Sequence, residues 1–273
     1  MFLYSEFSLL FDRKSKPLKL TYAGERYLYY VNMYDLMVKK MEIEFAEITS
    51  NKKGKIIIGI SPWRSSYMLP IILPAFKEKY PFIEIVTKEG IENELCELVD
   101  NNQVDFSIKC FSHPNPMYNC ETIMKERILL AINRNNPIIK KLGLKEEFCK
   151  NNIHHINILD VKDENFILPN QYQELYSVIQ KMLKKHKINI EGFETANVGT
   201  ALNLVRQNYG LTFVPESIII HSKSIRDIVF FTVDSPTLYW YLTIIYKKNS
   251  HLSKISRLFV NELKNTFKSQ FVE

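Results

Sequence analysis

No apolar run in the sequence approaches the roughly 18 residues that a membrane-spanning helix needs. The apolar start, residues 1–11, lacks the basic beginning of a signal peptide and is interrupted by Glu6. Asp12 and Arg13 then stand where a signal peptide would need small residues for cleavage. The sequence therefore predicts a cytoplasmic protein with no membrane partner.

Motifs that carry catalysis or bind metals are scarce as well. No G-x-S-x-G, P-loop, HExxH or dinucleotide fingerprint occurs, which argues against an enzyme and predicts no cofactor. His154 and His155 would point to opposite faces of a strand, and no carboxylate is spaced to join them, so we expect no metal site there. The cysteines form no CxxC and no ligand-like pairing with histidine, which predicts reduced thiols; they are Cys96, Cys110, Cys120 and Cys149.

The composition is that of a folded globular chain. Eight glycines and eleven prolines in 273 residues are too few for a fibrous or low-complexity protein, and 12% aromatic residues argue against disorder. The sequence has 36 Lys and Arg against 30 Asp and Glu, a formal net charge of +6. This small surplus suits an anionic partner, either a nucleic acid or a small carboxylate.

A long helix is expected from Thr21 to about Ser50. Its apolar residues recur in alternating steps of four and three, the a/d spacing of a heptad repeat; they are Tyr27, Val31, Tyr34, Val38, Met41, Phe45 and Ile48. Thr21 is placed to cap the N-terminus. The helix either packs on its own domain or pairs with a second copy of the chain. The narrow, strictly heptad stripe favours a dimerisation helix that makes a homodimer through residues 27–48, and a tetramer stays open.

A basic turn precedes this helix. It contains Pro17 and the cations Arg13, Lys14, Lys16 and Lys19, and it leads into a short strand at 18–20. A basic hairpin before a dimer helix suits contact with DNA phosphates, whereas the pattern alone would equally suit a solvated loop.

Strands and helices alternate through the rest of the chain, which predicts an α/β fold with a parallel sheet. We expect strands at 55–60, 83–87, 104–108 and 126–133, with helices at 67–80 and 91–101. A second set follows, with strands at 166–169, 192–196 and 211–214 and helices at 171–187 and 198–209. A returning strand at 239–246 and a helix at 252–267 close the chain.

Ligands of such sheets bind beyond the carboxyl ends of strands, near helix N-termini. The residues at these positions are Ser61, Arg64, Ser65, Ser66, Gly90, Ile91, Phe111, Asn170, Asn197 and Thr200. Arg64 is the side chain best suited to hold an anion, with a solvent-facing Arg64 as the alternative. Ser61 and Asn197 would also serve as ordinary helix caps. The positive helix ends favour a small anionic effector, whereas Trp63, Tyr67 and Phe111 would line a pocket for an aromatic one.

The region around the basic turn resembles the wing and linker helix of LysR-type transcriptional regulators. That family typically shows LFxRxxRxxxLTxAGE here, and Leu10-Phe11, Arg13, Leu20-Thr21 and Ala23-Gly24-Glu25 match. In the family about fifty residues of winged helix-turn-helix precede this motif. The resemblance thus implies a wing remnant at 1–20, a linker helix at 21–52, and DNA binding only where the helix-turn-helix is supplied.

The body of the chain resembles the effector domain of the same family. Ile56-Ile-Ile-Gly59, Leu69 to Pro81, Leu98 to Ile108 and Val205 to Pro215 match its motifs in order. The resemblance implies a two-lobed, periplasmic-binding-protein-like (type II) effector domain behind the dimerisation helix. Lobe I would comprise 54–127 and 238–273, and lobe II 128–237. We expect effector sensing coupled to transcription regulation. The alternative is a solute-binding protein of a transporter, which would require export.

Overall fold

The computed structural model describes residues 10–12, 16–49, 53–113, 115–143, 153–222, 225–233 and 238–268. The chain divides into two compact units, Met1–Gly54 and Lys55–Glu273, and each is described by itself.

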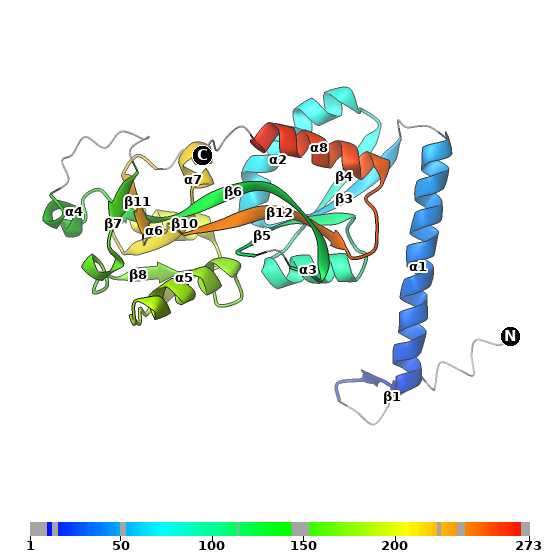
Figure 1. Cartoon of the computed structure of the whole chain (residues 1–273), viewed down its shortest axis with the longest axis horizontal. Coiled ribbons are helices and arrows are strands. Elements are labelled where there is room, and N and C mark those ends of the chain that lie inside the picture. The colour runs from blue at the N-terminus through cyan, green and yellow to red at the C-terminus, as the bar shows by residue number, and fades with distance from the viewer. Residues whose placement is uncertain are drawn as a thin grey trace. The chain divides into compact units, whose positions relative to one another are not determined.

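The first unit is a short hairpin followed by a long helix (Figure 1). Strand β1 (Phe11–Asp12) pairs antiparallel with β2 (Lys19–Leu20), and α1 spans Tyr22–Thr49, as the heptad spacing predicts. Thr21 caps the helix, since its Oγ1 accepts a hydrogen bond from the Gly24 amide at 3.1 Å. A Cβ at Gly24 would lie 2.1 Å from the Leu10 carbonyl oxygen, so only glycine lets the hairpin approach the helix this closely.

Five of the seven heptad positions on α1 carry exposed apolar side chains. Tyr27, Val31, Tyr34, Met41 and Phe45 each leave at least two fifths of their surface to solvent. The exposure extends beyond the stripe to other apolar side chains of α1, among them Leu28, Tyr29, Tyr30, Met33 and Met37.

The second unit begins with alternating strands and helices. These are β3 (Gly54–Ile60), α2 (Pro62–Lys79), β4 (Ile83–Glu89), α3 (Glu92–Asp100), β5 (Phe106–Phe111) and β6 (Tyr118–Asn133). The element types match the prediction, but the start of α2 was placed wrongly at Tyr67. Ser61 is the N-cap residue and Pro62 the first helical residue, a position that proline favours because its missing N–H needs no partner. The predicted end of β5 at Ile108 is also wrong, because the strand continues to Phe111.

The remaining elements form the other end of the unit. They are α4 (Pro137–Lys141), β7 (His154–Ile156), a 3₁₀ turn (Ile158–Asp160), β8 (Phe166–Leu168), α5 (Glu174–Lys185), β9 (Gly192–Glu194), α6 (Val198–Arg206), β10 (Leu211–Pro215), α7 (Ser217–His221), β11 (Ile228–Val233), β12 (Tyr239–Lys247) and α8 (Lys254–Lys268). Five of these were not among the expected elements, namely α4, β7, the 3₁₀ turn, α7 and β11.

Strand β6 belongs to two sheet halves in succession. Its residues Tyr118–Arg127 pair antiparallel with β12, which continues to β5, β3 and β4; we call these four partner strands the first sheet half. From Ile128 to Asn133 β6 pairs instead with β10 and β11, whose neighbours are β8, β9 and β7; these five strands form the second sheet half. Figure 1 shows β6 and β12 running side by side. The partners of β6 therefore change between Arg127 and Ile128.

The core lies between these strands and the helices that cover them. Helices α2 and α8 pack together over the first sheet half, where the rings of Phe76 and Phe259 meet at 5.0 Å between centroids. Both rings are fully buried, and so is every β6 residue from Ile128 to Ala131. Burying one such side chain stabilises the fold by about 1.5–3 kcal/mol, so β6 is anchored over its whole central stretch.

Candidate functional site

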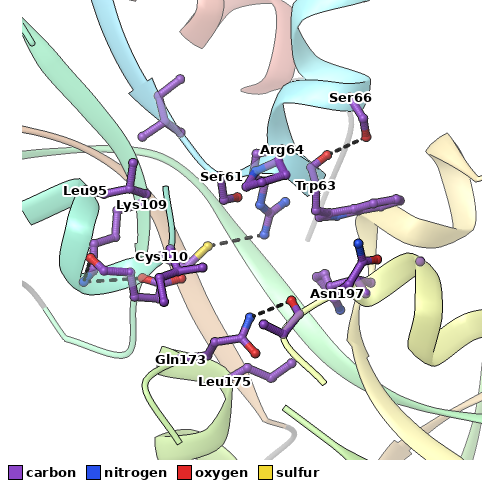
Figure 2. A pocket seen from close by; sticks show the side chains of 18 of the residues that line it. Ser61, Trp63, Arg64, Ser66, Leu95, Lys109, Cys110, Gln173, Leu175 and Asn197 are labelled. Atoms are coloured by element: carbon purple, nitrogen blue, oxygen red, sulfur yellow. Dashed lines mark hydrogen bonds and ion pairs between the residues drawn. The ribbon is translucent and has the colours of Figure 1, made fainter. Parts of the chain in front are cut away.

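A cavity of about 510 Å³ opens where the strand-to-helix connections of both sheet halves meet. Residues at the start of α2 line one side, and Gln173 and Leu175 at the start of α5 line the opposite side (Figure 2). Lys109 and Cys110 of β5 and Asn197 before α6 complete the ring of polar groups that Figure 2 labels. Each helix presents its N-terminus, where amide hydrogens carry partial positive charge.

Five of the ten predicted ligand-binding residues line this cavity. They are Ser61, Arg64, Ser66, Ile91 and Asn197. Ser61 makes no capping hydrogen bond with its side chain, so its hydroxyl is available to a molecule in the cavity. Asn197 does cap α6, because its Oδ1 accepts from the Thr200 amide at 3.0 Å. Ser66 turns its hydroxyl back to the carbonyl oxygen of Trp63 at 2.8 Å (Figure 2).

The other five predicted residues are not among those that line the cavity. Ser65 lies inside α2, where its amide bonds to the Ser61 carbonyl. Gly90 is buried, and its amide donates to the carbonyl of Ile60.

Phe111, Asn170 and Thr200 serve the fold in other ways. Phe111 packs with Val99, Val104, Tyr118 and Ile245 in a separate apolar cluster. Asn170 closes a local turn, because its Oδ1 accepts from the Tyr172 amide at 3.1 Å. Thr200 uses its amide in the α6 cap.

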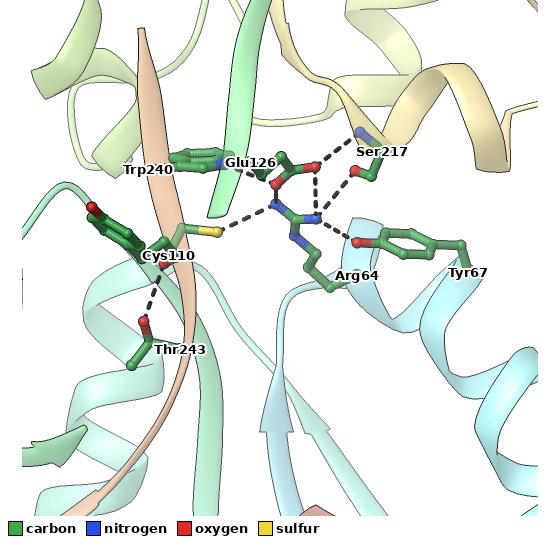
Figure 3. A network of polar contacts seen from close by, with 8 residues as sticks. Arg64, Tyr67, Cys110, Glu126, Ser217, Trp240 and Thr243 are labelled. Carbon is green, nitrogen blue, oxygen red and sulfur yellow. Dashed lines mark hydrogen bonds and ion pairs between the residues drawn. The ribbon is translucent and has the colours of Figure 1, made fainter. Parts of the chain in front are cut away.

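Arg64 is only 4% exposed, so the alternative of a solvent-facing arginine is wrong. Its guanidinium forms a buried ion pair with Glu126 of β6 and also donates to the hydroxyls of Tyr67 and Ser217 (Figure 3). A weaker contact joins Nη2 to Cys110 Sγ at 3.3 Å. The charge of Arg64 is therefore already compensated by a carboxylate of the protein.

Glu126 is the centre of this network. Its Oε1 accepts from the Ser217 amide at 2.9 Å, and its Oε2 accepts from Trp240 Nε1 at 2.8 Å (Figure 3). Burial would raise the pKa of Glu126, but the charge of Arg64 and the hydrogen bonds from Arg64 and Ser217 outweigh it and hold that pKa below the ordinary value. Burial raises the pKa of the neighbouring Cys110 thiol to about 12. Glu126 is thus a buried anion, and Cys110 is a neutral thiol.

A second buried pair lies at the other edge of the cavity. Lys109 Nζ stands 3.4 Å from Glu92 Oε2 and donates to the Glu92 carbonyl oxygen at 2.9 Å. Burial raises the pKa of Glu92, and the charge of Lys109 opposes this only in part. Neither Lys109 nor Glu92 was among the predicted residues.

Two polar atoms of the cavity residues are buried without a hydrogen-bond partner in the structure. One is the indole Nε1 of Trp63, a donor, and the other is Oε2 of Glu92, an acceptor that lies 3.4 Å from Lys109 Nζ. Buried polar atoms nearly always have partners, so each such atom calls for an explanation.

One contact joins the two sides of the cavity directly. Glu174, in the first turn of α5, accepts hydrogen bonds on Oε1 from the Ser112 amide at 3.0 Å and from its hydroxyl at 2.7 Å. Ser112 follows β5 of the first sheet half, whereas α5 follows β8 of the second. The two halves are therefore held together at this edge by side-chain hydrogen bonds.

Sequence reasoning overlooked Lys109 and Glu126 because both lie inside strands. The signal was nevertheless present, since a charged residue in an apolar strand such as Phe106–Phe111 needs a buried partner or a function. The partners themselves are 17 and 62 residues away, beyond what a local pattern can show.

The structure describes two of the four cations predicted for the wing. Lys16, shortly before β2, and Lys19, in β2, are both exposed, while Arg13 and Lys14 lie outside the described residues. Among the described residues, no three His, Cys, Asp or Glu side chains gather closely enough to hold a metal ion. Nor is any described helix long and apolar enough to cross a bilayer.

Comparison with known proteins settles the family. The model of the LysR substrate binding domain matches residues 49–268, most of the chain. The chain belongs to the LysR family. The LysR assignment agrees with the β6 crossing and the cavity between the sheet halves, which are the features of a two-lobed, type II periplasmic-binding-protein-like fold.

A relative with a curated name supports the same function class. The "Probable RuBisCO transcriptional regulator" of Thalassiosira pseudonana is 22% identical over 262 residues, which cover 93% of this chain and 82% of the relative. Family membership and the names of such relatives support transcription regulation as the function class, and they give no support to the solute-binding alternative.

Solved structures of LysR-type domains share the fold. The effector binding domain of QuiR in complex with shikimate superposes with a TM-score of 0.66 at 17% identity, covering 81% of this chain and 100% of that one. The regulatory domain of CcmR from Synechocystis PCC6803, in complex with 2-PG, gives 0.67 at 17% identity, covering 80% and 99%. Both of those solved domains hold a small molecule.

Proposed function

We propose that this LysR-family chain binds a small-molecule effector in the cavity of about 510 Å³. Effector binding would change the arrangement of the chain and thereby regulate transcription at the DNA to which the regulator is bound. The observation that carries the proposal is the convergence of helix N-termini from both sheet halves on one cavity that contains buried polar atoms without partners. A ligand there would touch both halves at once. Because it can make its full set of contacts in only one arrangement of the halves, its binding favours that arrangement.

The lobes follow from the pairing of β6. We propose lobe I as 54–127 with 238–273, and lobe II as 128–237, because β6 exchanges β12 for β10 and β11 after Arg127. The Arg64–Glu126 network also spans this boundary, since Ser217 belongs to lobe II and the other members to lobe I. Effector binding would change the angle between the lobes about this crossing.

Dimerisation is proposed through α1. The stripe of residues 27–48 has the spacing of a two-helix seam, and its exposed apolar side chains, Tyr27, Val31, Tyr34, Met41 and Phe45, would be buried against a second copy. We propose a homodimer, with a tetramer built from two such dimers as the alternative. The cations of the wing, Arg13, Lys14, Lys16 and Lys19, would contact DNA phosphates, as exposed lysines beside a hairpin can.

Chemistry in the cavity is proposed to be binding without catalysis. The thiol of Cys110 has a pKa raised to about 12 by burial, so it is not a nucleophile at neutral pH. A cytoplasmic location is proposed from the free thiols, because Cys96, Cys110 and Cys120 are all unbridged. Cys149 lies outside the described residues.

The proposal is tested by a thermal-shift screen of the full chain against small carboxylates, amino acids, sugar acids and aromatic acids. A ligand at one hundred times its dissociation constant stabilises by about 2.7 kcal/mol, which is readily seen as a rise in melting temperature. The matched variant is Gly199→Leu, which adds a side chain on the cavity lining where a Cβ would meet only Asn197 Oδ1 at 3.1 Å. Hits that Gly199→Leu abolishes support the proposal. Hits that it leaves unchanged, or no hit across the library, contradict it.

A further inference from the structure

The charges around the cavity cancel in pairs. Arg64 is paired with Glu126, and Lys109 is paired with Glu92. The sum over these four residues is zero, and both cations are almost fully buried with their carboxylates beside them. A simple anionic effector would therefore find no uncompensated side-chain cation in the described part of the cavity.

The carboxylate of Glu92 can still accept a hydrogen bond from a ligand. Its Oε2 is buried and accepts no hydrogen bond, although Lys109 Nζ lies 3.4 Å away. A carboxylate oxygen can accept more than one bond and is most stable when donors or positive charge surround it. Burial raises the pKa of Glu92 even though the charge of Lys109 opposes the shift, so a further positive group beside Oε2 would favour the charged carboxylate. A donor with positive charge, such as an ammonium group, would complete its environment.

Donors for a negative group lie at the start of α2. The Ser61 hydroxyl makes no capping bond, and Trp63 and Arg64 hold amide positions whose hydrogens have no partner within the helix. The indole Nε1 of Trp63 is a further buried donor without a partner. Helix α2 has 18 residues, and its N-terminal partial charge favours a carboxylate.

From these observations we propose that the effector is a zwitterionic amino acid with an apolar side chain. Its ammonium group bonds to Glu92, its carboxylate bonds at the start of α2, and its side chain packs against apolar residues of the lining such as Leu95, Ile108 and Leu175. The inference rests on the proposed effector cavity and narrows the class of molecule that fills it.

Matched triplets of compounds test this class on the full chain by isothermal titration calorimetry. Each triplet holds an apolar amino acid, the same molecule without its ammonium group and the same molecule without its carboxylate. L-leucine, 4-methylpentanoate and isoamylamine form one triplet, and L-phenylalanine, 3-phenylpropanoate and 2-phenylethylamine form another. The valine, isoleucine, methionine and tryptophan triplets complete the panel. For at least one triplet we expect the amino acid to bind ten-fold or more tightly than both of its analogues.

Two variants test which residues bind the ammonium group and the carboxylate of the amino acid. Glu92→Gln should weaken the amino acid at least ten-fold and abolish its advantage over the carboxylate analogue, because the amide carries no charge and frees Lys109 to hold an anion. Trp63→Phe keeps an aromatic ring but removes the indole N–H with the second ring, and it should weaken the amino acid and the carboxylate analogue alike. Glu97→Gln is the control, since Glu97 lies exposed on the same helix α3 and does not line the cavity. It should leave every affinity unchanged.

Results that contradict the amino-acid proposal can be told apart from results that contradict the effector cavity itself. A carboxylate or amine analogue that binds as tightly as its amino acid, and that Gly199→Leu abolishes, would overturn the zwitterion and leave the effector cavity standing. Absence of binding by every triplet, together with a cavity-dependent hit in the wider screen, would overturn it in the same way. Amino-acid binding that survives both Glu92→Gln and Gly199→Leu would overturn both proposals.

Discussion

Glu126 and Arg64 form an ion pair in which both carboxylate oxygens and both terminal guanidinium nitrogens take part. The two side chains are 0% and 4% exposed, so water contributes little to their solvation. They lie 62 residues apart and meet where β6 leaves the first sheet half. A buried pair of this kind adds little net stability as a pair, yet it penalises any arrangement that separates its members.

Removing the charge of Glu126 should destabilise the fold strongly. We expect Glu126→Gln to lower the free energy of unfolding by about 3–5 kcal/mol, because Arg64 is left as a buried charge without a counter-ion. Urea unfolding at pH 7, followed by circular dichroism, measures this loss. The double variant Arg64→Met with Glu126→Gln should recover more than half of it. A double variant no more stable than Glu126→Gln would show that the loss comes from the Ser217 and Trp240 hydrogen bonds.

The same pair predicts an acid dependence of stability. The pKa of Glu126 is lowered in the fold, so its stabilising contribution is present above the ordinary carboxyl pKa of 4.5 and is lost as the pH falls through the lowered value. Unfolding free energies measured from pH 7 downward should therefore fall less steeply in Glu126→Gln than in the parent chain. Parallel curves would contradict the assignment.

Cys110 should resist alkylation in the folded chain. Its thiol is buried and its pKa is raised to about 12, whereas Cys96 and Cys120 are partly exposed. Treatment with iodoacetamide at pH 8, read by peptide mass spectrometry, should label Cys110 at least ten-fold more slowly than Cys120. In urea the difference should vanish, and rapid labelling of Cys110 without urea would contradict the buried network.

The contact between Glu174 and Ser112 should hold the two sheet halves together. Glu174→Ala removes the acceptor of two hydrogen bonds, so we expect a loss of about 1–2 kcal/mol in unfolding free energy. Hydrogen exchange at the Ser112 amide should accelerate more than exchange in the centre of β6. Glu191→Ala, at an exposed position, is the control. Unchanged exchange at Ser112 would show that other groups close this edge.

Ligand binding should weaken in acid if Glu92 holds an ammonium group. Burial raises the pKa of Glu92, so its negative charge is lost at a higher pH than the ordinary glutamate value of 4.5. Three charged groups act on it, since Lys109 and Arg64 oppose the shift and Glu174 adds to it. Calorimetry of the amino acid identified above should show affinity falling as the pH drops toward that raised pKa. Glu92→Gln should lack this fall, and a variant that retains it would assign the titration elsewhere.

Charges on the α1 stripe should separate the dimer. Val31 and Val38 occupy heptad positions, so Val31→Asp with Val38→Asp would place four carboxylates in the seam of a dimer. We expect at least a ten-fold rise in the dimer dissociation constant, measured by sedimentation equilibrium. Lys40→Asp, at an exposed position off the stripe, is the matched control. An unchanged mass in the double variant would place the dimer interface outside α1.

Local periodicity was enough to predict α1, because its apolar residues recur at heptad spacing, and the βα pattern, because each of those helices buries one apolar face. It was not enough for α7, whose Ile218–Ile220 run is β-branched and typical of a strand. The run forms a helix because the Ser217 amide, at its start, donates to a buried carboxylate from a distant strand. Strand β11 has a similar dependence, since its partner residues in β6 lie about a hundred positions earlier.

The candidate site divides along the same line. Ser61 and Asn197 could be predicted, because the end of a strand and the start of a helix are local features that mark a sheet's binding edge. Arg64 could be placed at that edge but not paired, since its partner Glu126 belongs to another strand. Glu92 and Lys109 could not be predicted as site residues, because only the folded chain brings them together as a pair at the cavity.

Strand β6 has a mechanical consequence for any signal that passes through the chain. A loop joint permits large rotations at one or two dihedral angles, whereas an unbroken strand whose hydrogen bonds serve both sheet halves does not. A rotation of one sheet half relative to the other must therefore be distributed as additional strand twist over several β6 residues on each side of Arg127. The elastic resistance of that twist limits the amplitude and returns the lobes when the ligand leaves. A small change of angle at the crossing is then enlarged in proportion to distance from β6.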